Sequence, residues 1–394
     1  MSEAKTRPAE ARNVKRVGHS DINGWGDAFQ VIVRENKWCY VAASGMNGHE
    51  GTSILDVEDP TNPKVRTQIP APAGTHSHKV LFLDDVMIVN AEQIRGWQGE
   101  GFVGGIRLFD ASDPAKPRFI KDFPMYGRGT HRPILDEKNR MLYCSCGAPG
   151  YRGNILWILD IGDPANPKVV SQFALDGQRE GTPLPPGVHT LQFHQSNRRG
   201  DCLYAGCADW GVVVLDVKDP ARPRQIGHFN PTPPYPGHCH TVLPVPETDL
   251  LVVTHESTSF EVAEAPGFIF IYDAKVPSNP VPISAWMPYP VDPRTLYPRA
   301  GDWTARGGRY GAHNVWEFMG PKDFVYTTWF NAGLRIVDIS DPFRPVEVGY
   351  YVPAGINGRA TPQSNDCFVD GRGLVYVTDR WGCGLDILEY TGPR

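Results

Sequence analysis

Short apolar runs that end in an acidic residue recur along the whole chain. In most copies an Asp-Pro-x-x-Pro turn follows the acid, and successive acids lie 50 to 65 residues apart. The runs are Ile54-Leu55-Asp56, Leu108-Phe109-Asp110, Ile158-Leu159-Asp160, Val214-Leu215-Asp216, Ile271-Tyr272-Asp273, Ile336-Val337-Asp338 and Ile387-Leu388-Glu389. Seven units of this length predict a repeat architecture, either a β-propeller or a solenoid.

Each unit predicts four β-strands, because apolar and polar residues alternate over four to six positions between Gly- and Pro-rich turns, with no sustained helical period. The segment after the proline turn, such as 64–69 or 224–229, is expected to form the outer strand. A loop then leads to an innermost strand, expected over 78–83, 131–135, 189–193, 240–245 and 313–318. The third strand follows a tight turn, and the apolar run before the acid is the fourth. The predicted fold class is therefore all-β.

The two ends of the sequence favour a closed ring. The last unit lacks an outer strand after its apolar run, and residues 13–18 have the pattern of that missing strand. An open solenoid would need capping units, which the pattern does not provide. We expect residues 1–394 to form one seven-bladed β-propeller of four-stranded antiparallel blades, with the N-terminal strand closing the C-terminal blade. Residues 1–9 are expected to be a flexible tail.

The fifth unit is the longest because it contains an insertion over 286–310 that is rich in Pro and Arg. A long loop without an element of its own is often a lid over a site, and it can equally contact a second subunit. The sequence therefore leaves open whether the protein forms a homo-oligomer.

Composition and charge narrow the classes of partner. The 41 Gly and 37 Pro are spread over all 394 residues, as a turn-rich fold requires. The net charge of −5 gives no case for nucleic acid or an anionic membrane as partner, so a small molecule is expected. No run approaches the ~18 apolar residues of a membrane span. Eight cysteines without a C-x-x-C pair, and an N-terminus without an apolar signal segment, predict a cytoplasmic location.

The apolar runs resemble a known family of bacterial repeats. Residues 334–338 read Leu-Arg-Ile-Val-Asp and residues 212–216 read Val-Val-Val-Leu-Asp, which is similar to the motif of the LVIVD-repeat proteins. The resemblance covers nearly all of the chain and implies a propeller. It implies little about activity, so function has to be argued from the site.

Histidine recurs at the start of the expected innermost strand. The equivalent residues in the seven units are Phe29, His78, His131, His189, His240, His313 and Asn365. Innermost strands line the channel of a propeller, so these side chains should converge. Converging neutral imidazoles predict a divalent transition metal, namely Zn, Fe, Mn or Cu, rather than Ca or Mg. The alternative is a structural histidine multiplied by duplication.

Further polar residues are expected at the same mouth, where the third strands end. Glu92, Glu256, His255 and Arg380 are the predicted catalytic residues. Either acid would act as a general base or orient an imidazole that binds the metal. The alternative for each acid is a solvated loop charge.

The substrate-binding residues are expected to be Arg132, Arg306, Arg309, Trp329 and Asn365. A guanidinium pairs well with a carboxylate, which favours an anionic substrate. Solvated arginines and tryptophans that pack between blades are the alternatives.

The functional hypothesis is a metal-dependent hydrolase or lyase that acts on a small carboxylated substrate. Two alternatives stay open from sequence. One is a non-haem iron oxygenase or copper oxidase at the same site, and the other is a non-catalytic propeller scaffold.

Overall fold

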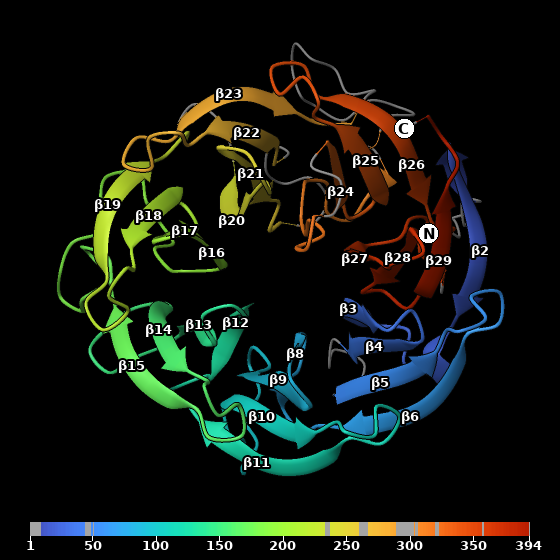
Figure 1. Cartoon of the computed structure of the whole chain (residues 1–394), viewed down its shortest axis with the longest axis horizontal. Helices are drawn as coiled ribbons and strands as arrows, with labels where there is room; N and C mark the ends of the chain where they lie inside the picture. The colour runs from blue at the N-terminus through green and yellow to red at the C-terminus, as the bar shows by residue number, and fades with distance from the viewer. Residues whose placement is uncertain are drawn as a thin grey trace.

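The computed structural model describes residues 9–43, 49, 51–232, 237–259, 267–288, 303, 306–319, 323–356 and 358–393. In this part of the chain, seven antiparallel sheets stand around a central channel, and one short 3-10 helix, η1 (Ile22–Gly24), joins the strands (Figure 1). The predicted seven-bladed all-β propeller is therefore confirmed. The described residues contain no helix with the length and apolar character needed to cross a bilayer.

We number the blades in chain order, each from its innermost to its outer strand. Blade 1 is β3 (Ala28–Arg34), β4 (Trp38–Ala43), β5 (Gly51–Asp56) and β6 (Lys64–Pro70), and blade 2 is β7 (Thr75–His76) with β8 (Val80–Leu83), β9 (Val86–Gln93), β10 (Gly105–Asp110) and β11 (Arg118–Pro124). Blade 3 is β12 (Thr130–Asp136), β13 (Met141–Cys146), β14 (Ile155–Asp160) and β15 (Lys168–Phe173), and blade 4 is β16 (Ser196–Arg199), β17 (Cys202–Gly206), β18 (Val212–Asp216) and β19 (Arg224–Phe229).

Blade 5 is β20 (His238–Pro244), β21 (Leu250–Glu256), β22 (Ile269–Asp273) and β23 (Val281–Trp286). Blade 6 is β24 (Phe324–Thr328), β25 (Leu334–Asp338) and β26 (Val346–Val352), with β1 (Glu10–Arg12) added outside β26. Blade 7 is β27 (Ser364–Val369), β28 (Leu374–Asp379), β29 (Gly384–Tyr390) and β2 (Val14–Ser20).

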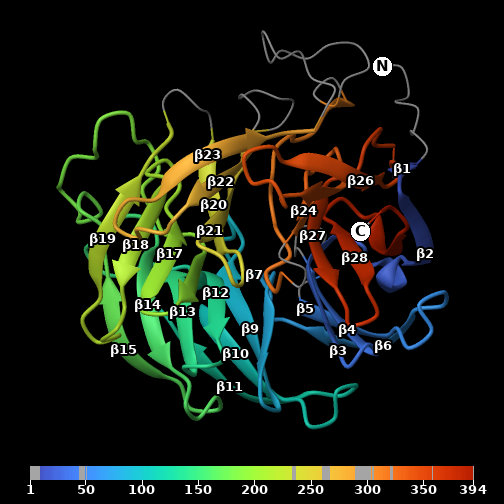
Figure 2. The ribbon, with the colours of Figure 1, turned by 45° about the horizontal axis from the view of Figure 1, so that its top comes forward.

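The N-terminal strand closes the ring as predicted. Strand β2 pairs antiparallel with β29, with Val14 opposite Tyr390 and Ser20 opposite Leu385. Figure 2 shows β2 at the edge of the C-terminal blade. Residues 1–8 of the expected tail, and residues 289–302 and 304–305 of the expected lid, lie outside the described residues.

The acid of each repeat has a local structural role. Asp216 accepts a hydrogen bond from the backbone N–H of Lys218 at 3.0 Å and one from Arg224 at 2.6 Å. The equivalent Asp56 makes the same two kinds of bond. These contacts fix the turn between the fourth strand and the outer strand, which explains why the apolar run ends in an acid.

The hydrophobic core lies between blades. Seven buried clusters each combine residues of two neighbouring blades, and the seventh joins blade 7 to blade 1 through residues such as Leu385 and Val41. A single blade therefore has no complete core of its own.

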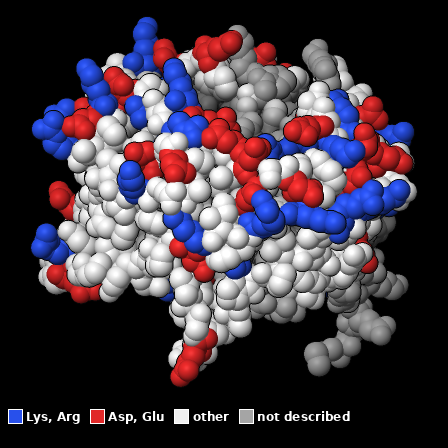
Figure 3. All heavy atoms as spheres, turned by 60° about the horizontal axis from the view of Figure 1, so that its bottom comes forward, with Lys and Arg blue, Asp and Glu red and all other residues white. Residues whose placement is uncertain are grey.

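The visible surface mixes Lys and Arg with Asp and Glu, without a large area of one sign (Figure 3).

Two innermost segments differ from the prediction. In blade 4 the strand covers Ser196–Arg199, so the expected strand over 189–193 is wrong. In blade 6 the segment after His313 forms one isolated bridge, Val315 to Thr327, in place of a strand. The His313 N–H still donates to the carbonyl of Thr328 at 3.0 Å, so this segment keeps the innermost position.

A buried ionic network fills the channel below the mouth where the innermost strands begin. The Glu317 carboxylate accepts bonds of 2.7 and 2.8 Å from Lys79 Nζ and one of 3.1 Å from Arg132 Nη2. Lys79 and Arg132 are 0% and 5% exposed. Glu317 lines a cavity of about 470 Å³ on one side, and Arg132 lines one of about 710 Å³ on the other. The network therefore separates two cavities.

Glu317→Gln should destabilise the fold strongly, because it leaves two buried cations without their counter-ion. Breaking a buried ion pair typically costs about 3–5 kcal/mol. Urea unfolding followed by tryptophan fluorescence measures this loss. Glu137→Gln, at an exposed position, is the control and should change the free energy of unfolding by less than ~0.5 kcal/mol. Similar values for both variants would contradict the role of the network.

Asp366 should make stability fall as the pH rises. Burial and the neighbouring Glu317 raise its pKa to about 7, although Arg132 and Lys79 oppose the shift. The folded state then binds a proton that the unfolded state releases near pH 4, so stability is lost between about pH 4 and 7. Asp366→Asn cannot ionise, and its stability relative to the wild type should rise between pH 5 and 8. A constant difference over this interval in urea unfolding would refute the assignment.

The cysteines should resist thiol reagents in the native protein. All eight are free, and seven are buried, with Cys202 partly exposed. Burial raises the pKa of Cys146 and Cys239 to about 12, which suppresses the reactive thiolate. Iodoacetamide at pH 7.5, followed by intact mass measurement, should modify at most Cys202, whereas the protein in urea should take up eight labels. Rapid native labelling of several thiols would contradict the packing of the blades.

Candidate functional site

Six imidazoles surround the cavity of about 710 Å³ at the mouth where the innermost strands begin. They belong to His76, His78, His131, His194, His240 and His313. Neighbouring rings from blades 2 to 6 have centroids 3.9 to 4.7 Å apart, in the order His78, His131, His194, His240, His313. Four of the five predicted ring histidines therefore lie together, and a fifth member takes the place of His189.

Hydrogen bonds orient the rings of His131 and His194. His131 Nδ1 donates to Glu92 Oε2 at 2.6 Å, and His194 Nδ1 donates to the backbone carbonyl of His240 at 3.0 Å. An imidazole that carries its single proton on Nδ1 presents Nε2 as a lone pair. The two Nε2 atoms are 2.9 Å apart. Two lone pairs at this distance repel unless they share a proton or a cation.

His240 and His313 have the same orientation. His240 Nδ1 lies 2.8 Å from the Thr241 hydroxyl, which itself donates to Gln195, so the imidazole is the donor. His313 Nδ1 donates to the carbonyl of Asn365 at 2.6 Å. Four successive blades, 3 to 6, thus use Nδ1 as the donor and turn Nε2 to one cavity.

Burial keeps three of these rings neutral. It lowers the pKa of His194 and His240 well below the usual value, and neighbouring histidines and Arg132 add to the effect. Burial also lowers the pKa of His313 to about 3, although the Glu256 carboxylate opposes the shift. At neutral pH these imidazoles have the form that binds metals.

In the part of the chain that the structure describes, the carboxylates of Glu92 and Glu256 reach the cavity, with different surroundings. Burial raises the pKa of Glu92, but His131, His76 and Arg128 outweigh it and bring the pKa to about 2. Its Oε2 is held by His131, so Glu92 acts as the orienting partner of that ring.

Glu256 lies between the imidazoles of blades 5 and 6. Its oxygens are 3.9 Å from His240 Nε2 and 3.8 Å from His313 Nε2, and Arg309 donates to it at 3.0 Å. Burial raises the pKa of Glu256, but His313, Arg309 and Arg380 outweigh it, and the net pKa is lowered. The carboxylate is ionised, and it faces two lone pairs across a gap longer than a hydrogen bond.

Arg380 and Arg309 also line this mouth. Arg380 donates to Asn365 Oδ1 at 2.9 Å through Nε, and its guanidinium lies 4.6 Å from the centre of the Phe29 ring. Asn365 therefore holds the arginine in place. Arg132 reaches the bottom of the cavity, where its guanidinium is bound to Glu317 and Gln195.

The structure does not bring the other predicted site residues to this cavity. His189 is exposed, and its backbone N–H donates to Asp209. His255 and Trp329 are both 0% exposed, His255 against Phe270 in its own blade and Trp329 in the core between blades 5 and 6. These three placements were wrong.

Arg306 is also placed elsewhere. It forms an ion pair with Glu10 at 2.7 Å and lies 3.8 Å from the centre of the Trp303 ring. The prediction of a substrate-binding Arg306 was therefore wrong, because the guanidinium is taken up by the N-terminal segment and an aromatic ring.

Sequence reasoning missed His194. The number of residues between the histidine and the strand that follows the innermost segment in the chain would have identified it. In blades 2, 3, 5 and 6 the ring histidine lies 8 to 11 residues before that strand begins, and His194 lies 8 residues before Cys202, whereas His189 lies 13 before it. A short hairpin cannot accommodate the longer interval.

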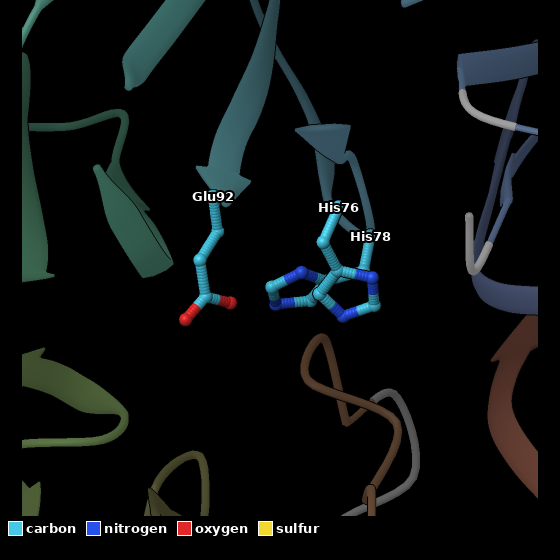
Figure 4. A group of neighbouring side chains, drawn as sticks. All are labelled: His76, His78 and Glu92. Carbon is cyan, nitrogen blue, oxygen red and sulfur yellow. The ribbon is translucent and has the colours of Figure 1, made fainter. Parts of the chain in front are cut away.

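Among the described residues, two groups of His and Glu side chains bring possible metal-binding atoms within 4.8 Å of one another. They are His194, His240 and Glu256, and His76, His78 and Glu92. Figure 4 shows the second group, in which the two imidazoles lie against each other and the carboxylate extends beside them. The His76 and His78 rings are stacked with centroids 4.3 Å apart.

Comparisons with solved structures agree with the fold. A chain from the crystal structure of the mitotic checkpoint complex matches with a TM-score of 0.57, at 10% identity, over 99% of this chain and 97% of that one. The Cps50 (Swd1) β-propeller domain of Myceliophteria thermophila matches with 0.53, at 14% identity, over 97% and 99%. The computationally designed Ika8 protein matches with 0.51, at 7% identity, over 91% and 95%. At these identities the likeness concerns the fold alone.

No curated protein matches the chain. The family model that matches is the LVIVD repeat, over residues 150–174 and 322–352. These segments contain the ends of blades 3 and 6, where the apolar run, its acid and the outer strand follow one another. The chain is therefore a seven-bladed β-propeller that carries LVIVD repeats.

Proposed function

We propose that this chain is a metal-dependent enzyme that binds one divalent transition metal at the mouth lined by histidines. The observation that carries the proposal is the common orientation of four rings. His131, His194, His240 and His313 each use Nδ1 as a donor and turn Nε2 to the same cavity. Structural histidines multiplied by duplication would need no such agreement, whereas metal ligands do.

The donor set selects the metal. Imidazole nitrogen suits Zn, Fe, Mn and Cu, while Ca and Mg prefer a shell of oxygens. Three of the four rings are at most 5% exposed, so they lose little conformational freedom when a cation binds.

We propose hydrolase or lyase chemistry on a small carboxylated substrate. Glu256 supports this reaction class, because it is ionised, only 12% exposed in its side chain, and close to two of the proposed ligand rings without bonding them. It would accept the proton from water or from a carbon acid held at the metal, as a general base does. Arg380 and Arg309 at the same mouth would pair with the substrate carboxylate.

A redox enzyme is the second proposal, favoured by one observation. The four ligands are neutral nitrogens, and a set of this kind serves iron in an oxygenase or copper in an oxidase as readily as it serves zinc. Oxygen uptake by the iron- or copper-loaded protein with aromatic and sugar acids separates the two proposals.

We propose a cytoplasmic location for either enzyme, because all eight thiols are free.

Metal analysis of the untagged protein tests the site. We expect about one equivalent of a transition metal, since a site with four ligands is nearly stoichiometric. His194→Ala should lower the affinity by at least ~100-fold, because losing even an indirect partner of a ligand costs 10- to 100-fold.

His189→Ala is the matched control, because this histidine belongs to the same blade and is exposed away from the cavity. It should keep the metal content of the wild type. Less than about a tenth of an equivalent in reconstituted wild type, against the stoichiometric content expected, would exclude the metal site. That result would favour the non-catalytic scaffold.

A further inference from the structure

Asn90 fixes the proton of His78 on the opposite nitrogen from the other four rings. The backbone N–H of Lys79 lies 2.7 Å from Asn90 Oδ1, and an N–H can only donate, so this atom is the amide oxygen. The amide nitrogen, Nδ2, then lies 3.0 Å from the carbonyl of Thr130, 3.1 Å from His78 Nδ1 and 3.3 Å from the carbonyl of His76. Its two hydrogens point to the two nearer acceptors, and a proton on His78 Nδ1 would set two donors against each other at 3.1 Å, so His78 Nδ1 is an acceptor.

A neutral imidazole with an accepting Nδ1 carries its proton on Nε2. His78 is 3% exposed, and its Nε2 is a buried atom without a hydrogen-bond partner among the described residues. A buried N–H without an acceptor is costly, and such groups in native proteins usually meet a ligand or water. The ring lines the large cavity next to His131, with centroids 4.7 Å apart.

This proton argues against a cation held by His76, His78 and Glu92. A metal needs the Nε2 lone pair, which His78 lacks while Asn90 donates to Nδ1. One Glu92 oxygen is also committed to His131, at 2.6 Å. One of the two stacked rings in Figure 4, His78, therefore presents a donor to the cavity in place of a lone pair.

We propose that His78 donates a hydrogen bond from Nε2 to a carboxylate oxygen of the substrate, and that it is not a metal ligand. This proposal rests on the proposed function, since it places the substrate beside the metal. The ring of blades then has two parts. Blades 3 to 6 supply lone pairs to the cation, and blade 2 supplies an N–H to the anion.

The position of the proton can be measured without metal or substrate. Two-bond ¹H–¹⁵N correlation spectra of the ¹⁵N-labelled protein distinguish the two tautomers, and the His78→Gln spectrum assigns the signals of His78. We expect a protonated Nε2 for His78 and a protonated Nδ1 for His240 and His313. A His78 ring with its proton on Nδ1, or with both nitrogens protonated at pH 7.5, would overturn the proposal.

Binding to the zinc-loaded protein tests the role of this donor, with acetate as the probe. His78→Ala should keep the zinc content of the wild type and weaken acetate binding by about 10-fold or more, the usual loss for a hydrogen bond to a charged group. His78→Gln keeps a side-chain N–H and should recover part of the affinity. Loss of zinc in both variants, or unchanged acetate affinity in both, would refute the proposal.

Asn90→Asp provides an independent test. The ionised carboxylate that this substitution introduces accepts from Nδ1–H, which moves the proton of His78 away from Nε2. Acetate binding should weaken as in His78→Ala, and the NMR signal should change tautomer. If the wild type binds no zinc at all, the proposed function fails, whereas the tautomer measurement still decides the state of His78.

Discussion

The pairing of β2 with β29 is the constraint on which the rest of the structure depends. Each hydrophobic cluster is shared by two neighbouring blades, so no blade buries its apolar residues alone. Only a closed ring gives blades 7 and 1 a common core. Closure also fixes the channel, because the innermost segments of all seven blades then start at one mouth. Residues from His76 to Arg380, more than 300 positions apart, meet there for this reason.

The fold could be predicted because its signals are local. The Asp-Pro-x-x-Pro turn, the acid before it and the outer strand after it occupy consecutive positions, and the outer strand over Arg224–Phe229 has the predicted limits. The carboxylate of the acid accepts a hydrogen bond from the backbone N–H two residues later in the chain, as Asp160 and Asp216 show. Since each contact is short in sequence, its pattern is visible without the structure.

The site was only partly predictable, because its members depend on contacts between blades. His189 and His194 both precede blade 4, and the motif around His189 looks more like those of the other units. The pairing of strands determines which histidine reaches the cavity. Ser196–Arg199 is the segment that pairs with β17, and His194 lies just before it. Similarly, His255 and Glu256 are adjacent on β21, and alternation along the strand sends only Glu256 to the cavity.

The residues that hydrogen-bond to the ring histidines differ from blade to blade, and they determine which nitrogen of each imidazole carries the proton. Duplication explains why imidazoles occur at one position of several blades, but it does not explain where their protons lie. Those positions are set by Glu92 for His131, by a carbonyl for His194 and by Asn90 for His78. The first two acceptors leave a lone pair in the cavity, and the amide donor leaves an N–H. A ring of equivalent residues thereby acquires two kinds of group, which is what a site for both a cation and an anion requires.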